Sequence, residues 1–356
     1  MLTGPGLALS PNELTPIRVL VPGTGTRFRC GGLSVALQTA RLLSQLRPTQ
    51  VVTYRQRQND HPFLDDLLQK EDAPGQALWM VSWGFDVPFL LRRLRRRPVL
   101  YQAHSTGYGF DLPPGVPVLA VSRNTLGYWG NRAPRNPLFL LPNALEPQWL
   151  ERGERQGSLQ NRPIDVLVQQ RKSSAYVIEQ LVPALRTQGL KVEVQNGWVD
   201  DLVALFNSAK VYLYDSAEHW RAAGVSEGFG LPPLEAMACG CVVFSSLNHA
   251  LADTLTPGES AHQIGQGLLA QDVDRIRAAV QDPLSWRLSH QELDVLLSSH
   301  SEVHLLKRWQ QALLSVDAFF ARNPLAPEAQ LLRAVPPWRL RSGKLLRRLL
   351  RQLRRA

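Results

Sequence analysis

Short apolar runs of strand length alternate along most of this chain with longer stretches whose apolar residues recur at helical spacing. The pattern predicts strands at residues 17–21, 50–54, 77–83, 98–103, 116–121 and 138–141, and again at 165–168, 191–194, 210–214 and 241–245. It predicts helices at 33–46, 175–187, 200–208, 272–281 and 300–323. Strands and helices that alternate in this order favour parallel sheets covered by helices on both faces.

A polar stretch at residues 146–163 divides this pattern in two and is typical of a linker between domains. The chain has 356 residues, which is more than one hydrophobic core usually organises. We therefore expect an α/β protein with two Rossmann-like domains, 17–145 and 164–299, facing each other across a cleft. The remaining segments are an extension at 1–16, a helix at 300–323 and a tail at 324–356.

The composition is that of a globular protein, with 44% hydrophobic and 20% charged residues. Residues 1–16 contain no Lys or Arg and are broken by glycines and prolines, unlike a signal peptide. No apolar run approaches the roughly 20 residues of a membrane span. Of the three cysteines, Cys239 and Cys241 flank a single glycine, which does not suit a disulfide framework and predicts a reducing, cytoplasmic environment.

The net charge of +10 is concentrated at one end of the chain. Residues 338–356 hold eight Arg and Lys residues and no acid, so the rest of the chain is nearly balanced. Specific nucleic-acid binding therefore receives little support from the overall charge.

The stretch from Glu227 to Gly240 carries the most informative chemistry. It reads Glu-Gly-Phe-Gly-Leu-Pro-Pro-Leu-Glu-Ala-Met-Ala-Cys-Gly. The glycines let the backbone approach a ligand, and the two prolines mark the first turn of a helix that Gly240 ends. Free amides before a helix suit an oxygen-rich or anionic ligand, and two carboxylates eight positions apart can hold hydroxyls at two points.

This stretch is similar to the paired-glutamate signature of glycosyltransferase family 4. The resemblance implies the two-domain GT-B fold and transfer of a sugar from a nucleotide diphosphate with retention of anomeric configuration. It also implies that Glu227 lies beside the transferred sugar and that Glu235 holds the ribose. The donor-binding residues that it predicts are Gly228, Phe229, Gly230, Leu231 and Glu235. The alternative interpretation is a glycine-rich loop whose acids are solvated.

Two cations follow the first strand of the second domain. Arg171 and Lys172 resemble the basic pair that neutralises the departing diphosphate in that family. Many relatives place the lysine about five positions after the arginine, where this chain has Tyr176. Arg171 is therefore the better match, and two surface cations at a strand end are the alternative.

The first domain supplies three further candidates. Gly31 and Gly32 look like the family's glycine pair near the donor phosphates, and His104 resembles the histidine that projects toward the sugar. The Gly-x-Gly-x-x-Gly fingerprint of nicotinamide enzymes is not present in this loop. A structural histidine is the alternative for His104.

No metal or other cofactor is expected. Asp272-Val273-Asp274 has the D-x-D form of metal-dependent sugar transferases, but it directly precedes a helical stretch, where acids serve as cap or first-turn residues. The cysteines lack zinc spacing. The predicted catalytic set is Glu227, His104, Arg171 and Lys172, and the rival functions are a GT-B epimerase or phosphorylase and a non-catalytic carbohydrate-binding scaffold.

The tail at 338–356 repeats leucines at helical spacing among basic residues, the pattern of a basic amphipathic helix. A second basic cluster spans residues 92–97. We expect the enzyme to lie peripherally at the cytoplasmic face of an anionic membrane and to glycosylate a glycan or lipid-linked acceptor. A solvated helix and an RNA-binding arm are the alternatives.

Overall fold

The structure is a computed structural model that describes residues 15–70, 76–265 and 267–323. The chain divides into two compact units. Unit 1 comprises the described residues up to Leu119, Leu126–Phe139 and the described residues from Ala312 onward, and unit 2 comprises Ala120–Thr125 and the described residues of Leu140–Gln311. The predicted tail at 324–356 and most of the extension at 1–16 lie outside the described residues.

Unit 1 is built around a six-stranded sheet with the order β2-β1-β3-β4-β5-β6. Its elements are β1 (Ile17–Val21), α1 (Gly31–Leu43), β2 (Thr49–Thr53), α2 (Leu64–Lys70), β3 (Leu78–Val81), α3 (Val87–Arg93), β4 (Val99–Ala103), β5 (Val118–Ala120), α4 (Arg123–Arg132) and β6 (Leu138–Leu140). A 3₁₀ turn at Thr26–Phe28 precedes α1. The pairs of β1 with β2 and β3, and of β3 with β4, are parallel, as the sequence pattern predicts.

Unit 2 has a five-stranded sheet with the order β11-β10-β9-β7-β8. Its strands are β7 (Ile164–Gln169), β8 (Val192–Gln195), β9 (Ala209–Tyr214), β10 (Val242–Ser245) and β11 (His262–Gln263). Its helices are α5 (Pro147–Arg152), α6 (Val182–Thr187), α7 (Leu202–Asn207), α8 (Ala217–Ala223), α9 (Leu231–Ala238), α10 (Leu269–Gln281) and α11 (His290–Ser299). A π-helical segment, Tyr176–Leu181, runs directly into α6.

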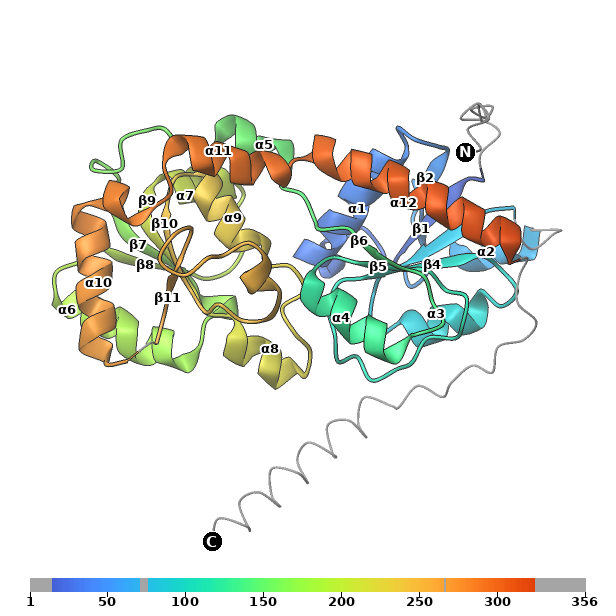
Figure 1. The fold of residues 1–356 in the computed structure, drawn as a ribbon, viewed down its shortest axis with the longest axis horizontal. Coiled ribbons are helices and arrows are strands. Elements are labelled where there is room, and N and C mark those ends of the chain that lie inside the picture. Colours follow the sequence, from blue (N-terminus) through green and yellow to red (C-terminus); the bar gives the residue numbers. More distant parts are fainter. Residues whose placement is uncertain (1–14, 71–75, 266, 324–356) are drawn as a thin grey trace, which may run out of the picture. The chain divides into compact units, whose positions relative to one another are not determined.

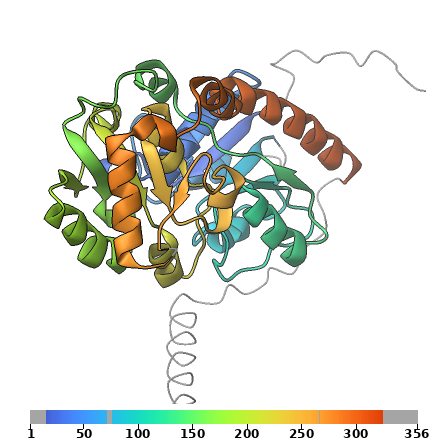
Figure 2. The ribbon, with the colours of Figure 1, turned by 60° about the vertical axis from the view of Figure 1, so that its left-hand side comes forward.

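The central strands β7, β9 and β10 of unit 2 are largely buried on both faces, and their alternate residues point to opposite sides of the sheet. Leu167 and Tyr212 belong to a core with α5, α7 and α9, whereas Val166 and Val211 belong to a second core with α6 and α10. Figure 1 shows the helices around this sheet, and Figure 2 brings α10 in front of it. This arrangement confirms the doubly covered α/β class.

The long helix α12 (Glu302–Arg322) follows α11, and its last part belongs to unit 1. The guanidinium of Arg47, which is 4% exposed, donates two hydrogen bonds of 3.0 and 2.6 Å to the carboxylate of Asp317. A bidentate pair of this kind fixes orientation as well as contributing energy. It holds α12 against the chain that follows α1.

Candidate functional site

The candidate residues of unit 2 gather where parallel strands end. Arg171 and Lys172 follow the carboxyl end of β7, and Ser216 follows the carboxyl end of β9, the neighbouring strand. Parallel strands of an open sheet end at one edge, which is where such folds bind ligands. The residues that follow β7 and β9 therefore lie at the same edge of the sheet, although they come from separate segments of the chain.

Glu227 lies at the centre of this group and is 4% exposed. Its Oε2 atom accepts hydrogen bonds from the Tyr214 hydroxyl at 2.6 Å, the Ser216 hydroxyl at 2.8 Å and the Trp220 indole N–H at 2.6 Å. Among the described residues, every hydrogen bond to this carboxylate reaches Oε2. A buried carboxylate with three donors is held in one orientation, because each donor offsets part of its lost hydration.

Trp220 also contacts one of the predicted cations. The Lys172 ammonium lies 5.2 Å from the centre of the Trp220 ring and 5.9 Å from that of Tyr214. These are cation–π distances. Trp220 therefore binds Glu227 through its ring nitrogen and Lys172 through its ring face, which joins an acid and a cation that are far apart in sequence.

The pKa of His219 is shifted by the charged residues of this group. Burial lowers the pKa of its imidazole, the charges of Lys172 and Arg171 lower it further, and the charge of Glu227 opposes them. Both predicted cations and Glu227 are therefore close enough to His219 for their charges to act on its imidazole. The structure brings Glu227, Lys172 and Arg171 together within unit 2.

Glu235 lies on α9 and is partly buried. Burial raises the pKa of its carboxyl to about 7 from an ordinary 4.5, the charge of Lys172 lowers it, and the charge of Glu146 raises it. Lys172 therefore acts on both predicted glutamates. The protonation state of Glu235 changes near neutral pH.

The loop between the glutamates requires glycine at Gly230. Its φ of 84° is in the left-handed region, and a Cβ atom there would lie 2.3 Å from Cδ2 of Leu251. Gly230 is also the N-cap of α9. In the part of the chain that the structure describes, the backbone amides of Gly228, Phe229 and Gly230 donate no hydrogen bond. Amides without an acceptor in the protein can donate to an oxygen-rich ligand.

The far end of α9 closes as the sequence predicts. Gly240 has φ 81°, its N–H donates to the Met237 carbonyl at 2.9 Å, and the Cys241 N–H donates to the Ala236 carbonyl at 3.0 Å. These two bonds form a Schellman motif. The helix that carries Glu235 is therefore fixed at its C-terminal end.

Tyr176, which stands where the family resemblance implies a lysine, binds an acid of unit 2. The Tyr176 hydroxyl donates to Oδ2 of Asp272 at 2.8 Å, and the Gly265 amide donates to the same atom at 2.7 Å. Asp272 is 2% exposed. Tyr176 and the first acid of the D-x-D sequence thus bind each other, in the first turn of α10.

In unit 1, Gly31 and Gly32 begin α1 and are exposed. A Cβ atom at Gly31 would meet nothing within 4 Å, and one at Gly32 would lie 3.8 Å from the Cys30 sulfur. Neither glycine is among the residues with positive φ. The fold itself therefore does not require glycine at these two positions.

His104 follows β4 in unit 1, next to buried Ser105. Burial lowers the pKa of its imidazole to about 4, so the ring is neutral at physiological pH. Its Nε2 atom is buried and has no hydrogen-bond partner among the described residues. A neutral imidazole with a buried, unpaired nitrogen has an unused capacity for hydrogen bonding.

The sequence analysis missed Tyr214, Ser216 and Trp220, the three residues that hold Glu227. The available signal was their position at or just after the carboxyl end of β9. That position alone does not show which carboxylate they bind.

Comparison with known proteins matches residues 188–292 to the family model described as "Glycosyl transferases group 1". This range includes Glu227 and Glu235 but not Arg171 or Lys172. The chain is similar to the serotype-specific mannosyltransferase WbdA of Escherichia coli, with 26% identity over 147 residues, which are 38% of this chain. A second match to a protein of that name has 32% identity over 94 residues. The first match spans 16% of the length of the E. coli protein.

Solved structures share the fold across most of the chain. The chain is similar to sucrose-phosphate synthase from Thermosynechococcus elongatus, with a TM-score of 0.60, 15% identity and coverage of 86% of this chain and 100% of that one. It is also similar to Anabaena HepE in complex with UDP and glucose, with a TM-score of 0.58, 14% identity and coverage of 85% and 100%. The two Rossmann-like units thus have the GT-B fold of these structures, and the match to the family model is confined to residues 188–292 of unit 2.

Proposed function

We propose that the chain is a retaining, metal-independent glycosyltransferase that moves a sugar from a nucleotide diphosphate to a glycan or lipid-linked acceptor. The observation that carries the proposal is the arrangement around Trp220, whose ring contacts Lys172 and whose nitrogen binds Glu227. A cation, an oriented acid and free amides in one place suit a ligand that is anionic at one end and rich in hydroxyls at the other. A nucleotide sugar has this chemistry.

The leaving diphosphate gains negative charge as its bond to the sugar breaks. Arg171, Lys172 and the amides of Gly228–Gly230 offer positive charge and donors to that group, and their arrangement before the reaction reduces the cost of reorganisation. In this mechanism the stabilisation comes from side chains and amides of unit 2. Turnover in excess EDTA tests metal independence, and loss of turnover that manganese restores contradicts it.

Glu227 is proposed to orient the sugar rather than attack it. Its Oε2 atom shares its charge with three donors, which makes that oxygen a poor nucleophile. Its Oε1 atom then accepts a hydrogen bond from a sugar hydroxyl. The acceptor attacks on the face from which the diphosphate leaves, the leaving phosphate takes the acceptor proton, and the anomeric configuration is retained.

Glu235 is proposed to hold the ribose hydroxyls. The pKa of the Glu235 carboxyl is near 7, and hydrogen bonds from hydroxyl groups favour its charged form. Binding of the ribose hydroxyls is therefore proposed to ionise this carboxyl. In unit 1, Gly31 and Gly32 are proposed to let the donor phosphates approach the backbone, and neutral His104 to bind the sugar through Nε2.

The similar proteins support the proposed donor class. HepE has been solved with UDP-glucose, and WbdA is named a mannosyltransferase. A screen of nucleotide sugars by thermal shift tests the proposal, because a donor at 100 times its dissociation constant stabilises the folded protein by about 2.7 kcal/mol. A stabilising donor that loses its effect in Glu235→Ala is expected. No shift with any common donor contradicts the proposal.

A peripheral membrane location remains part of the proposal. No helix among the described residues is long and apolar enough to span a bilayer. Arg92, Arg95 and Arg96 are exposed at and after the end of α3, whereas Arg93 pairs with Asp65. Each basic residue near an anionic leaflet contributes about 1 kcal/mol. Cosedimentation of the full chain and of a chain ending at Pro337 with anionic and neutral vesicles tests this location, and equal binding to both vesicle types contradicts it.

A further inference from the structure

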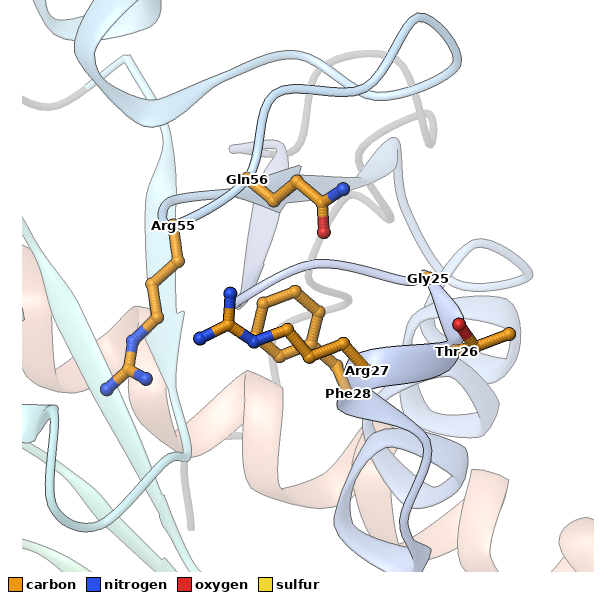
Figure 3. A pocket seen from close by; sticks show the side chains of 6 residues that line it. All are labelled: Gly25, Thr26, Arg27, Phe28, Arg55 and Gln56. Atoms are coloured by element: carbon orange, nitrogen blue, oxygen red, sulfur yellow. The ribbon is translucent and has the colours of Figure 1, made fainter.

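Unit 1 contains a pocket of about 540 Å³ that the proposed donor site does not use. Residues 25–28, which follow β1, form one side, and Arg55 and Gln56, which follow β2, form the other. Figure 3 shows the Arg27 side chain extending past the Phe28 ring toward the side on which Arg55 lies. The volume is in the range of small-molecule sites, about 300–1,000 Å³.

Contacts within the protein join and order the two walls of the pocket. The Thr24 amide and hydroxyl both donate to the side-chain oxygen of Gln58 at 3.0 Å, which joins the two loops. A Cβ atom at Gly23 would lie 2.6 Å from the Phe28 ring, so glycine is needed for that ring to pack over the backbone. Preformed walls reduce the entropy that a ligand must lose on binding.

The pocket lining contains two arginines and no acid. Arg55 pairs with Asp86. Arg27 is exposed and lies 5.8 Å from the Phe28 ring centre, and it makes no ion pair with any residue that the structure describes. One guanidinium of the pocket thus has no compensating acid within residues 15–70, 76–265 and 267–323. Guanidinium groups bind carboxylates and phosphates bidentately, whereas a neutral sugar has no need of them.

We propose that this pocket binds an anionic group of the acceptor, a phosphate or a carboxylate, through Arg27 and Arg55. The identification of the ligand as an acceptor rests on the proposed transferase function. Arg171 and Lys172 of unit 2 are the cations proposed for the donor diphosphate, which leaves the two pocket arginines to select among acceptors by charge. Gln56 and the Thr26 hydroxyl add polar groups for the sugar or carrier that bears the anion.

The test measures binding by calorimetry, not turnover, with geranyl diphosphate as a soluble lipid phosphate and methyl glucuronide as an acidic sugar. The wild-type chain is expected to bind one of the two, and the one that binds identifies the source of the anion. Arg27→Gln is expected to weaken that binding about tenfold or more, because a charge-assisted hydrogen bond contributes about 1.5–3 kcal/mol. Exposed Arg27 has no ion pair to lose, so the variant is expected to fold.

Arg135→Gln is the matched control, because Arg135 is an exposed arginine of the same unit in the segment leading into β6. It should bind the probe as the wild type does. Binding of neither probe by the wild type, or equal binding by Arg27→Gln, overturns the proposal. UDP-glucose and GDP-mannose are titrated in parallel. Loss of donor affinity in Arg27→Gln assigns the pocket to the donor and also overturns the proposal, whereas absent donor binding in every protein contradicts only the transferase function.

Discussion

Replacing Glu235 with glutamine should stabilise the free protein at neutral and alkaline pH. Burial raises the pKa of this carboxyl from 4.5 to about 7, so the folded state keeps a proton that the unfolded chain has released. Stability then falls as pH rises from about 4.5 to about 7, and the full cost is present above pH 7. The glutamine side chain is neutral at every pH, so the variant does not lose this stability as pH rises.

The size of the effect follows from the two pKa values. A difference of one pKa unit corresponds to 1.36 kcal/mol, so a carboxyl at about 7 rather than 4.5 costs about 3 kcal/mol above pH 7. Because Glu235 is only partly buried, this figure is an upper limit. At pH 4.5 the wild type and Glu235→Gln should have nearly equal stability, and at pH 8 the variant should be more stable.

Chemical denaturation at pH values from 4.5 to 8, without nucleotide, measures this difference. Glu193→Gln is the matched control, because Glu193 is an exposed acid on β8 in the same unit. Its stability curve should parallel that of the wild type. If the Glu235→Gln curve also stays parallel to the wild type, the account of Glu235 as a partly buried acid with a raised pKa is wrong.

Four further predictions concern single residues. Trp220→Phe removes one hydrogen-bond donor to Glu227. Steady-state kinetics should show turnover reduced about tenfold, and denaturation should show stability lowered by about 0.5–1.5 kcal/mol. Unchanged turnover contradicts the positioning role of Trp220. Gly230→Ala should destabilise by more than about 1 kcal/mol because of the left-handed φ and the Leu251 contact, and a neutral result in denaturation refutes the loop geometry. Gly31→Ala should fold at least as stably as the wild type yet bind donor more weakly; equal donor affinity in calorimetry removes Gly31 from the site. His104, with its pKa lowered to about 4, should cost stability as pH falls from about 6.5 to about 4; an NMR titration midpoint near 6.5 contradicts this.

The sheets were predictable from sequence because most of their strands contain short apolar runs bounded by polar or turn residues. Each of the ten predicted strands is present, with ends that differ by up to two residues. Strand β11 was missed because it has two residues, too few for any alternation to show. The order of strands in each sheet depends on packing between segments far apart in sequence, so no local sequence pattern predicts it.

The candidate site was predictable where its residues belong to a contiguous motif, as Glu227 does, or directly follow a predicted strand, as Arg171 and Lys172 do. The Glu227–Gly240 loop and helix have the expected turn, start and end, because glycine and proline constrain the backbone locally. The role of Trp220 depends on the turn between β9 and α8, which brings an indole back onto Glu227. Tyr176 likewise meets Asp272 only after the chain has formed α10. Contacts of this kind form only in the folded chain, and no spacing of residues in the sequence predicts them.

The most direct test of the central claim is calorimetric titration of the wild-type chain and Glu235→Ala with UDP-glucose and GDP-mannose in excess EDTA. The account predicts that the wild type binds one donor without metal and that Glu235→Ala binds it about tenfold more weakly or not at all, since hydrogen bonds to a charged group contribute about 1.5–3 kcal/mol. Equal affinity of the two proteins, or no binding of either donor by the wild type, would contradict it.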